Sequence, residues 1–122
     1  MKNTYVFLAG GIGITPFRSI IQDLIDRHVK ADIVLFYQAK DADELLFQDT
    51  FAEGQDKIGL QVHYVVNNHI TEDILREHVP GFLSRLYMIS GPISFVDHYR
   101  EMVHQMGVPF EAIKTDLFSG YA

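Results

Sequence analysis

The chain has 122 residues, of which 48% are hydrophobic, 21% are charged and none is cysteine. These values predict one globular domain and exclude disulfides, thiolate zinc sites, iron–sulfur clusters and a cysteine nucleophile. The net charge of −6, with ten dispersed Lys and Arg residues, argues against nucleic acid as a partner. We expect a cytoplasmic protein without a membrane span, because no apolar stretch reaches roughly 18 residues.

The first predicted element is an apolar strand over residues 5–9, which runs through a glycine turn into an amphipathic helical pattern. Such a junction presents unpaired backbone N–H groups and the positive end of a helix dipole, which favour a diphosphate. We expect Gly11 and Gly13 to let a ligand approach closely. Thr15 is expected to cap the helix, with Pro16 at its first position. A tight structural turn without a ligand is the alternative, since Pro16 stands where a dinucleotide fingerprint has glycine.

The rest of the chain alternates between strand and helix patterns. Further strands are predicted at 33–37, 61–66 and 86–90, each as an apolar run covered on both faces, with a last strand through Ile113. Helical patterns follow at 44–51 and 71–78, and a long helix lies between Pro92 and Gly107. Its apolar stripe is expected in the core: Phe95, Tyr99, Met102 and Met106. The alternation predicts a Rossmann-like α/β fold, with an open, mostly parallel five-stranded sheet and helices on both faces.

Ligands of such sheets bind at the carboxyl ends of the strands, near the switch point in strand order. Three segments are expected at this edge: the glycine turn, residues 38–43 and residues 90–92. In this order they resemble the NAD(P)-binding domain of the ferredoxin–NADP reductase family, which follows a flavin-binding barrel. Residues 9–16 are similar to the family's pyrophosphate loop and 35–47 to its ribose-recognition segment. Residues 89–92 resemble its C-G-P motif, and 116–121 resemble the D-x-F-x-G-Y ending of some members.

The resemblance implies which residues bind the dinucleotide: Gly10, Gly11, Gly13, Ile14, Thr15, Pro16, Lys40, Asp41, Gly91, Pro92 and Phe118. Lys40 stands where NADP-using members often carry an arginine for the ribose 2′-phosphate, whereas Asp41 favours an unphosphorylated ribose. The choice between NAD and NADP therefore stays open. Phe118 either covers a core edge or lies near the nicotinamide and flavin rings.

Ser90 is the candidate catalytic residue, because many members have a cysteine there beside the site of hydride transfer. It would position the nicotinamide; the alternative is an ordinary strand-end hydroxyl that satisfies the local backbone. We expect no metal site, because the six histidines lack the spacing of a zinc-protease motif.

The family's flavin motif is R-x-Y followed by Ser or Thr, but the R-x-Y at residues 85–87 precedes Met88. We therefore expect one nucleotide-binding domain over residues 1–122, with FAD or FMN supplied by a missing domain or a partner subunit. Its function would be to position NAD(P)H for hydride transfer to flavin within an oxidoreductase, and the isolated chain should be inactive. The alternative is a non-catalytic nucleotide-sensing or subunit-interaction module that kept the fold.

Overall fold

The computed structural model describes residues 3–117. Its strands and helices are, in chain order, β1 (Thr4–Gly10), α1 (Ile14–Asp26), β2 (Asp32–Ala39), α2 (Gln48–Lys57), β3 (Gln61–Val66), α3 (Glu72–His78), β4 (Leu86–Gly91), α4 (Ile93–Gln105) and β5 (Ile113–Leu117). Short 3₁₀ turns lie between them: η1 (Gly11–Gly13), η2 (Ala42–Glu44), η3 (Phe82–Ser84) and η4 (Phe110–Ala112). The patterns at 61–66, 71–78 and 86–90 and the long helix after Pro92 are thereby confirmed.

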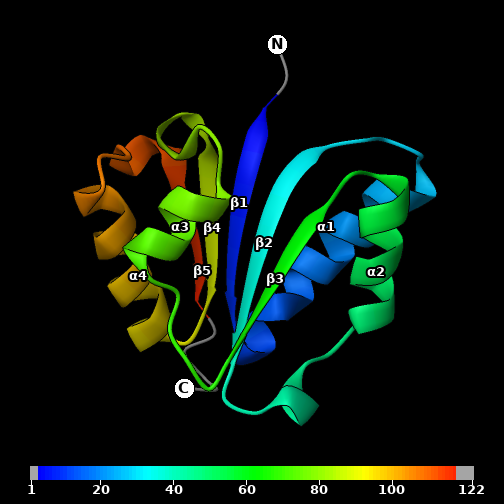
Figure 1. Ribbon diagram of the computed structural model, residues 1–122, viewed down its shortest axis with the longest axis horizontal. Coiled ribbons are helices and arrows are strands. Elements are labelled where there is room, and N and C mark those ends of the chain that lie inside the picture. Colours follow the sequence, from blue (N-terminus) through cyan, green and yellow to red (C-terminus); the bar gives the residue numbers. More distant parts are fainter. Residues whose placement is uncertain (1–2, 118–122) are drawn as a thin grey trace.

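The five strands form one sheet in the order β3-β2-β1-β4-β5, and every neighbouring pair is parallel. The predicted fold class is confirmed, with a sheet that is parallel throughout. From β1 the chain adds β2 and β3 on one side and then crosses over to add β4 and β5 on the other (Figure 1). The switch point therefore lies between the carboxyl ends of β1 and β4.

Helices cover both faces of the sheet, with α1 and α2 on one side and α3 and α4 on the other (Figure 1). Successive side chains of β1 alternate between the two cores, since side chains along a strand point to opposite faces. Val6 and Leu8 pack in the core beneath α3 and α4, while Phe7 packs in the core beneath α1 and α2. The predicted apolar stripe of α4 also faces the core, fully buried at Tyr99 and partly buried at Met102.

The start of α1 differs from the prediction. Gly13 is the N-cap residue and makes no side-chain cap, so Ile14, Thr15 and Pro16 occupy the first three helical positions. Burial explains this shift, because Ile14 is 0% exposed and its side chain packs in the core directly after the turn. Pro16 is tolerated at the third position because N–H groups in a first helical turn have no acceptor within the helix.

The helix predicted at 44–51 begins only at Gln48. Residues before it are held by the buried Tyr37, whose hydroxyl accepts a hydrogen bond from the Leu46 amide at 3.0 Å. The same hydroxyl contacts the Glu44 carbonyl at 3.4 Å. Leu45 is extended as a result, with ψ 122°, and the helical period cannot start there.

The prediction that the strand at 61–66 is covered on both faces is wrong. β3 stands at the edge of the sheet, and Tyr64 and Val66 are 39% and 36% exposed. An apolar run shows that a segment forms a strand, but its place in the sheet depends on partners that are distant in sequence.

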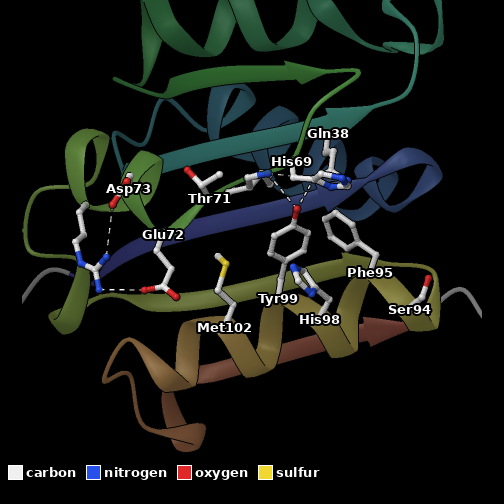
Figure 2. A pocket seen from close by; sticks show the side chains of 12 residues that line it. Gln38, His69, Thr71, Glu72, Asp73, Ser94, Phe95, His98, Tyr99 and Met102 are labelled. Atoms are coloured by element: carbon white, nitrogen blue, oxygen red, sulfur yellow. Dashed lines mark hydrogen bonds and ion pairs between the residues drawn. The ribbon is translucent and has the colours of Figure 1, made fainter.

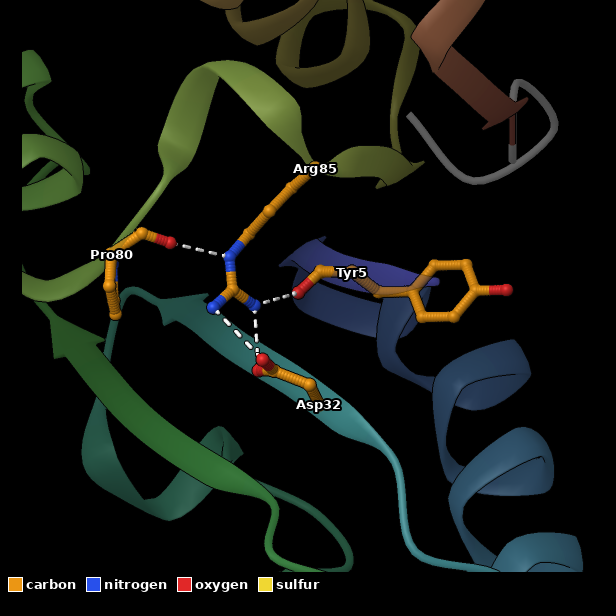
Figure 3. Close-up of polar contacts among 4 residues, drawn as sticks. All are labelled: Tyr5, Asp32, Pro80 and Arg85. Carbon is orange, nitrogen blue, oxygen red and sulfur yellow. Dashed lines mark hydrogen bonds and ion pairs between the residues drawn. The ribbon is translucent and has the colours of Figure 1, made fainter. Parts of the chain in front are cut away.

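At the amino edge of the sheet, Arg85 joins three strands (Figure 3). Its side chain is 5% exposed, and its Nη1 and Nη2 atoms lie 2.8 and 3.3 Å from the carboxylate oxygens of Asp32. It also donates to the carbonyls of Tyr5 and Pro80. Arg85 is thus a structural residue, far from the switch point. Among residues 3–117, no helix is both long and apolar enough to cross a membrane.

Candidate functional site

A cleft of about 440 Å³ opens at the carboxyl edge of the sheet, at the switch point. It is formed by the ends of β1, β2 and β3 and by the start of α4, and its lining consists of Gly10, Gly11, Gln38, Ala39, Lys40, Glu44, Asn67, Asn68, His69, Pro92 and Phe95. The structure therefore brings four of the predicted residues, Gly10, Gly11, Lys40 and Pro92, into one concave surface. This is the part of an open α/β sheet where ligands bind.

Three of the predicted glycines are needed for packing. A Cβ on Gly13 would clash with the carbonyl oxygen of Ser90, and a Cβ on Gly10 or Gly91 would lie 2.6 or 2.9 Å from the Phe95 ring. These close approaches join the β1 and β4 ends to each other and to α4. Contact with Ser90 therefore requires glycine at position 13, and the expectation that Gly13 lets a ligand approach stays a prediction.

Gly11 is different, because a Cβ there would meet nothing within 4 Å. It is exposed and has φ +55°, a backbone conformation that non-glycine residues rarely adopt. Its backbone thus faces open space beside the first turn of α1. Such a turn carries unpaired N–H groups and a partial positive charge, which suit an anionic ligand.

The other predicted residues of the first turn of α1 lie apart from the cleft. Ile14 is fully buried in the core beneath α1, and Thr15 is exposed. Pro16 lines a small cavity of about 40 Å³ next to Ser90. The Ile14 N–H already donates to the Gly11 carbonyl within the preceding 3₁₀ turn. Thr15 can contribute to a ligand site through its backbone N–H group, whereas Pro16 has none.

Ser90 is 0% exposed at the end of β4. Its hydroxyl oxygen has no hydrogen-bond partner among residues 3–117. It does not satisfy the local backbone, so that alternative for Ser90 is wrong. Buried polar groups without partners are uncommon, and this one remains available to a ligand group that enters beside it. The predicted site residue Phe118 lies outside the described residues.

At the end of β2, Lys40 faces the cleft but Asp41 does not line it. The carboxylate in the lining belongs instead to Glu44, three residues further on. Tyr37 is responsible for this position of Glu44, since its hydroxyl is hydrogen-bonded to the backbone of residues 44 and 46. Burial raises the pKa of that hydroxyl, which keeps it protonated. Sequence reasoning missed Glu44 because it assumed a helix at this point.

Sequence reasoning also missed the segment 67–69 after β3, which supplies three residues of the lining. The signal was available, because this polar segment directly follows a predicted strand and therefore lies at the same edge. Asn67 has φ +51°, and its amide donates to the Ala39 carbonyl at 2.9 Å. The segment is thereby tied to the end of β2.

Comparison with known proteins places the chain in a family. Residues 7–101 match the family described as the oxidoreductase NAD-binding domain. The chain belongs to this family. Human oxidoreductase NAD-binding domain-containing protein 1 is 30% identical, in an alignment that covers 88% of this chain and 43% of the human protein. NADH oxidoreductase HCR of Escherichia coli is 25% identical over 88% of this chain and 34% of its own length. This oxidoreductase NAD-binding domain thus spans less than half of these relatives.

Solved structures share the fold of this NAD-binding domain. The flavohem-like FAD/NAD-binding domain of nitric oxide dioxygenase from Vibrio cholerae superposes with a TM-score of 0.82 at 20% identity, covering 97% of this chain and 52% of that one. A mutant ferredoxin–NADP⁺ reductase from Plasmodium falciparum, in complex with 2′P-AMP, gives a TM-score of 0.70 at 15% identity, covering 95% of this chain and 53% of that one. The predicted resemblance to ferredoxin–NADP reductases is thereby confirmed for the fold.

Proposed function

We propose that this chain binds a nicotinamide dinucleotide, NADH or NADPH, in the cleft at the switch point and presents its nicotinamide to a flavin. FAD or FMN would be held by another domain or subunit. The observation that carries the proposal is Gly11, whose backbone faces open space at the start of α1 inside the cleft. Membership of the oxidoreductase NAD-binding domain family supports it.

The residues present fit such a cofactor. The backbone of Gly11 and the N–H group of Thr15 would hold the diphosphate. Lys40 and Glu44 would face the adenosine ribose, as both residues line the cleft. The nicotinamide end would lie toward Ser90, whose buried hydroxyl still lacks a hydrogen-bond partner within residues 3–117.

A bound nicotinamide cofactor supplies the hydride chemistry, so the protein has to bind, orient and exclude water. Ser90 would act as a positioning residue whose hydroxyl donates a hydrogen bond to the cofactor. No side chain of this domain needs to serve as an acid or base. Residues 1–122 would form a single nucleotide-binding domain within a larger flavin-dependent oxidoreductase.

The test compares Gly11→Asp with Gly11→Asn by calorimetry with NADH and with NADPH. Asp and Asn have nearly the same size and both tolerate a positive φ, so the two variants differ mainly in charge. We expect Gly11→Asp to bind both cofactors about tenfold or more weakly than Gly11→Asn, because its carboxylate would repel the diphosphate.

Gly81 provides the control for backbone strain. It has φ +66°, a Cβ there would also meet nothing within 4 Å, and it lies before β4 at the opposite edge of the sheet. Gly81→Asp should bind both cofactors like the wild type. Equal affinity of Gly11→Asp and Gly11→Asn would overturn the diphosphate assignment.

A further inference from the structure

Within residues 3–117, the outer edge of β3 has no neighbouring strand and lies outside the candidate site. β3 ends the sheet on one side (Figure 1), and none of its residues, Gln61–Val66, lines the cleft. The groove of about 770 Å³ between α3 and α4 shares Gln38, His69 and Phe95 with the cleft and therefore continues it, again without a residue of β3 (Figure 2). An edge strand presents unpaired N–H and C=O groups, which can pair with a further strand.

The features that usually protect an edge strand are missing from β3. It contains no proline and no Lys, Arg, Asp or Glu, and its register with β2 runs from Gln61 to Val66 without a bulge. Burial lowers the pKa of His63, and the nearby His78 lowers it further. Burial also raises the pKa of the Tyr64 hydroxyl. β3 is therefore an uncharged strand at neutral pH.

The other edge of the sheet is protected. β5 carries Lys114 and Asp116, both of them exposed, and charged side chains on an edge strand disfavour pairing with another chain. A head-to-tail contact between β3 of one copy and β5 of the next is thereby disfavoured, and it would also grow into open filaments. Pairing of β3 with itself across a two-fold axis avoids both problems.

One face of β3 leaves apolar side chains exposed. Tyr64 and Val66 are 39% and 36% exposed, on the same face as their β2 partners Tyr37 and Ala39. Leu46, which is 45% exposed, is held nearby, because its amide donates to the Tyr37 hydroxyl and the Tyr37 ring centre lies 6.1 Å from that of Tyr64. A second strand along β3 would cover Tyr64 and Val66, and burial of apolar surface favours association.

Antiparallel pairing centred on Tyr64 matches these side chains to one another. Directly opposite residues of antiparallel strands point to the same face of a sheet. With Tyr64 opposite the Tyr64 of a second copy, Val62 lies opposite Val66 on that face, and His63 lies opposite Val65 on the other face. Each cross-strand pair then consists of uncharged side chains, so no like charges oppose each other.

We propose that β3 pairs with the β3 of a second copy of this chain, antiparallel and centred on Tyr64. The two five-stranded sheets would thereby join into one continuous sheet. This inference goes beyond the proposed function and does not depend on it. β2 and β1 separate the paired edge from the switch point, so each copy would keep its own cleft.

Sedimentation equilibrium of the full chain tests the pairing. The wild type should change from the mass of one chain toward that of two as its concentration rises from micromolar to millimolar. Tyr64→Lys would place two ammonium groups opposite each other at the axis, and we expect it to raise the dissociation constant of the dimer about tenfold or more. Thr115→Lys is the matched control, because it adds the same charge to the opposite edge and should associate like the wild type.

A wild type that stays monomeric over this range would overturn the inference. An unchanged dissociation constant in Tyr64→Lys would also overturn it. The same holds for an equal loss in Tyr64→Lys and Thr115→Lys, which would show that net charge alone controls association.

A second experiment tests the register and does not depend on how Tyr64→Lys folds. The chain has no cysteine, and opposite Cα atoms of antiparallel strands are about 4.5–5.5 Å apart, within the range of a disulfide. Tyr64→Cys should therefore form a disulfide-linked dimer with oxidised glutathione as the oxidant. In the control Val66→Cys, on the same exposed face, the two thiols would be offset by about 14 Å along the strands and should not crosslink. Equal crosslinking of the two variants, or none in Tyr64→Cys, would overturn the pairing.

Discussion

Lys40 and Glu44 place opposite charges on the wall of one cleft. An ammonium there attracts a ribose 2′-phosphate, whereas a carboxylate repels it and can accept a hydrogen bond from an unphosphorylated ribose. Both side chains are exposed. Exposed ion pairs contribute only about 0.2–1 kcal/mol, so neither charge is expected to dominate the choice of cofactor.

We therefore predict that the wild type discriminates between NADH and NADPH by less than about tenfold. Lys40→Ala should weaken the binding of NADPH a few-fold, by about 0.2–1 kcal/mol, and should weaken the binding of NADH less. Calorimetric titration with both cofactors measures this, with Lys30→Ala before β2, at the opposite edge, as the control. An equal loss for both cofactors, or rejection of one by orders of magnitude, would mean that another group reads the ribose.

At the scale of elements, the contact between β3 and α3 contains two imidazoles. The rings of His63 and His78 are 4.7 Å apart, and His63 also packs edge-on against Phe36. Burial lowers the pKa of His63 from its usual 6.5, and the nearby His78 lowers it further. The unfolded chain therefore takes up a proton at His63 at a higher pH than the folded chain does.

From this we predict that the free energy of unfolding falls as the pH is lowered through about 6.5 toward the depressed pKa of folded His63. Above that pH range the contribution of His63 to stability is fully present, because its imidazole is neutral in both the folded and the unfolded chain. Urea titrations at a series of pH values should show a flatter profile for His63→Gln than for the wild type. The control is His28→Asn, at a loop position with φ +56° that Asn tolerates. If the free energy of unfolding of His63→Gln depends on pH as steeply as that of the wild type, other groups cause the pH dependence.

The Arg85 contact is a second property of elements, since it connects the amino ends of β1, β2 and β4. Removing the carboxylate with Asp32→Ala would leave a guanidinium that is 5% exposed with only carbonyl partners. We expect a loss of about 2–3 kcal/mol in the free energy of unfolding, below the usual value for a fully buried pair because Asp32 is 46% exposed. Urea denaturation measures it.

Asp23→Ala is the matched control for this loss. It breaks the Asp23–Arg27 pair, whose side chains are 63% and 60% exposed, and should reduce stability far less. Similar losses in the free energy of unfolding of the two variants would show that the buried Arg85–Asp32 pair stabilises the fold no more than an exposed pair does.

At the scale of the whole molecule, the proposed function gives this chain one half of a reaction that needs two. It covers 43% of the human relative and 34% of the Escherichia coli relative. The proposed cleft accounts for a hydride donor, and a flavin acceptor would have to come from another domain or subunit.

We therefore predict that the isolated chain binds dinucleotide but does not turn it over. NADH or NADPH with a dye acceptor and no added flavin should give background rates in a diaphorase assay. Robust turnover without flavin would contradict the proposal that the acceptor is bound elsewhere.

The sequence by itself determined the alternation of strands and helices, the parallel fold and the edge at which the cleft opens. These depend on local signals, such as the apolar run before Gly10, the period of α1 and the termination of α4 before Gly107. The loops after parallel strands meet at one edge of the sheet, which is why the predicted residues Gly11, Lys40 and Pro92 lie together in the cleft.

Only the tertiary structure decided how these residues are used. Gly13 is required by the backbone at Ser90, and Arg85 is buried by an ion pair with Asp32, contacts between residues distant in sequence. Likewise, Glu44 replaces Asp41 in the cleft because the buried Tyr37 holds the intervening backbone. Periodicity and turn propensity describe neighbours along the chain, whereas close packing, strand order and buried hydrogen bonds depend on partners that only folding brings together.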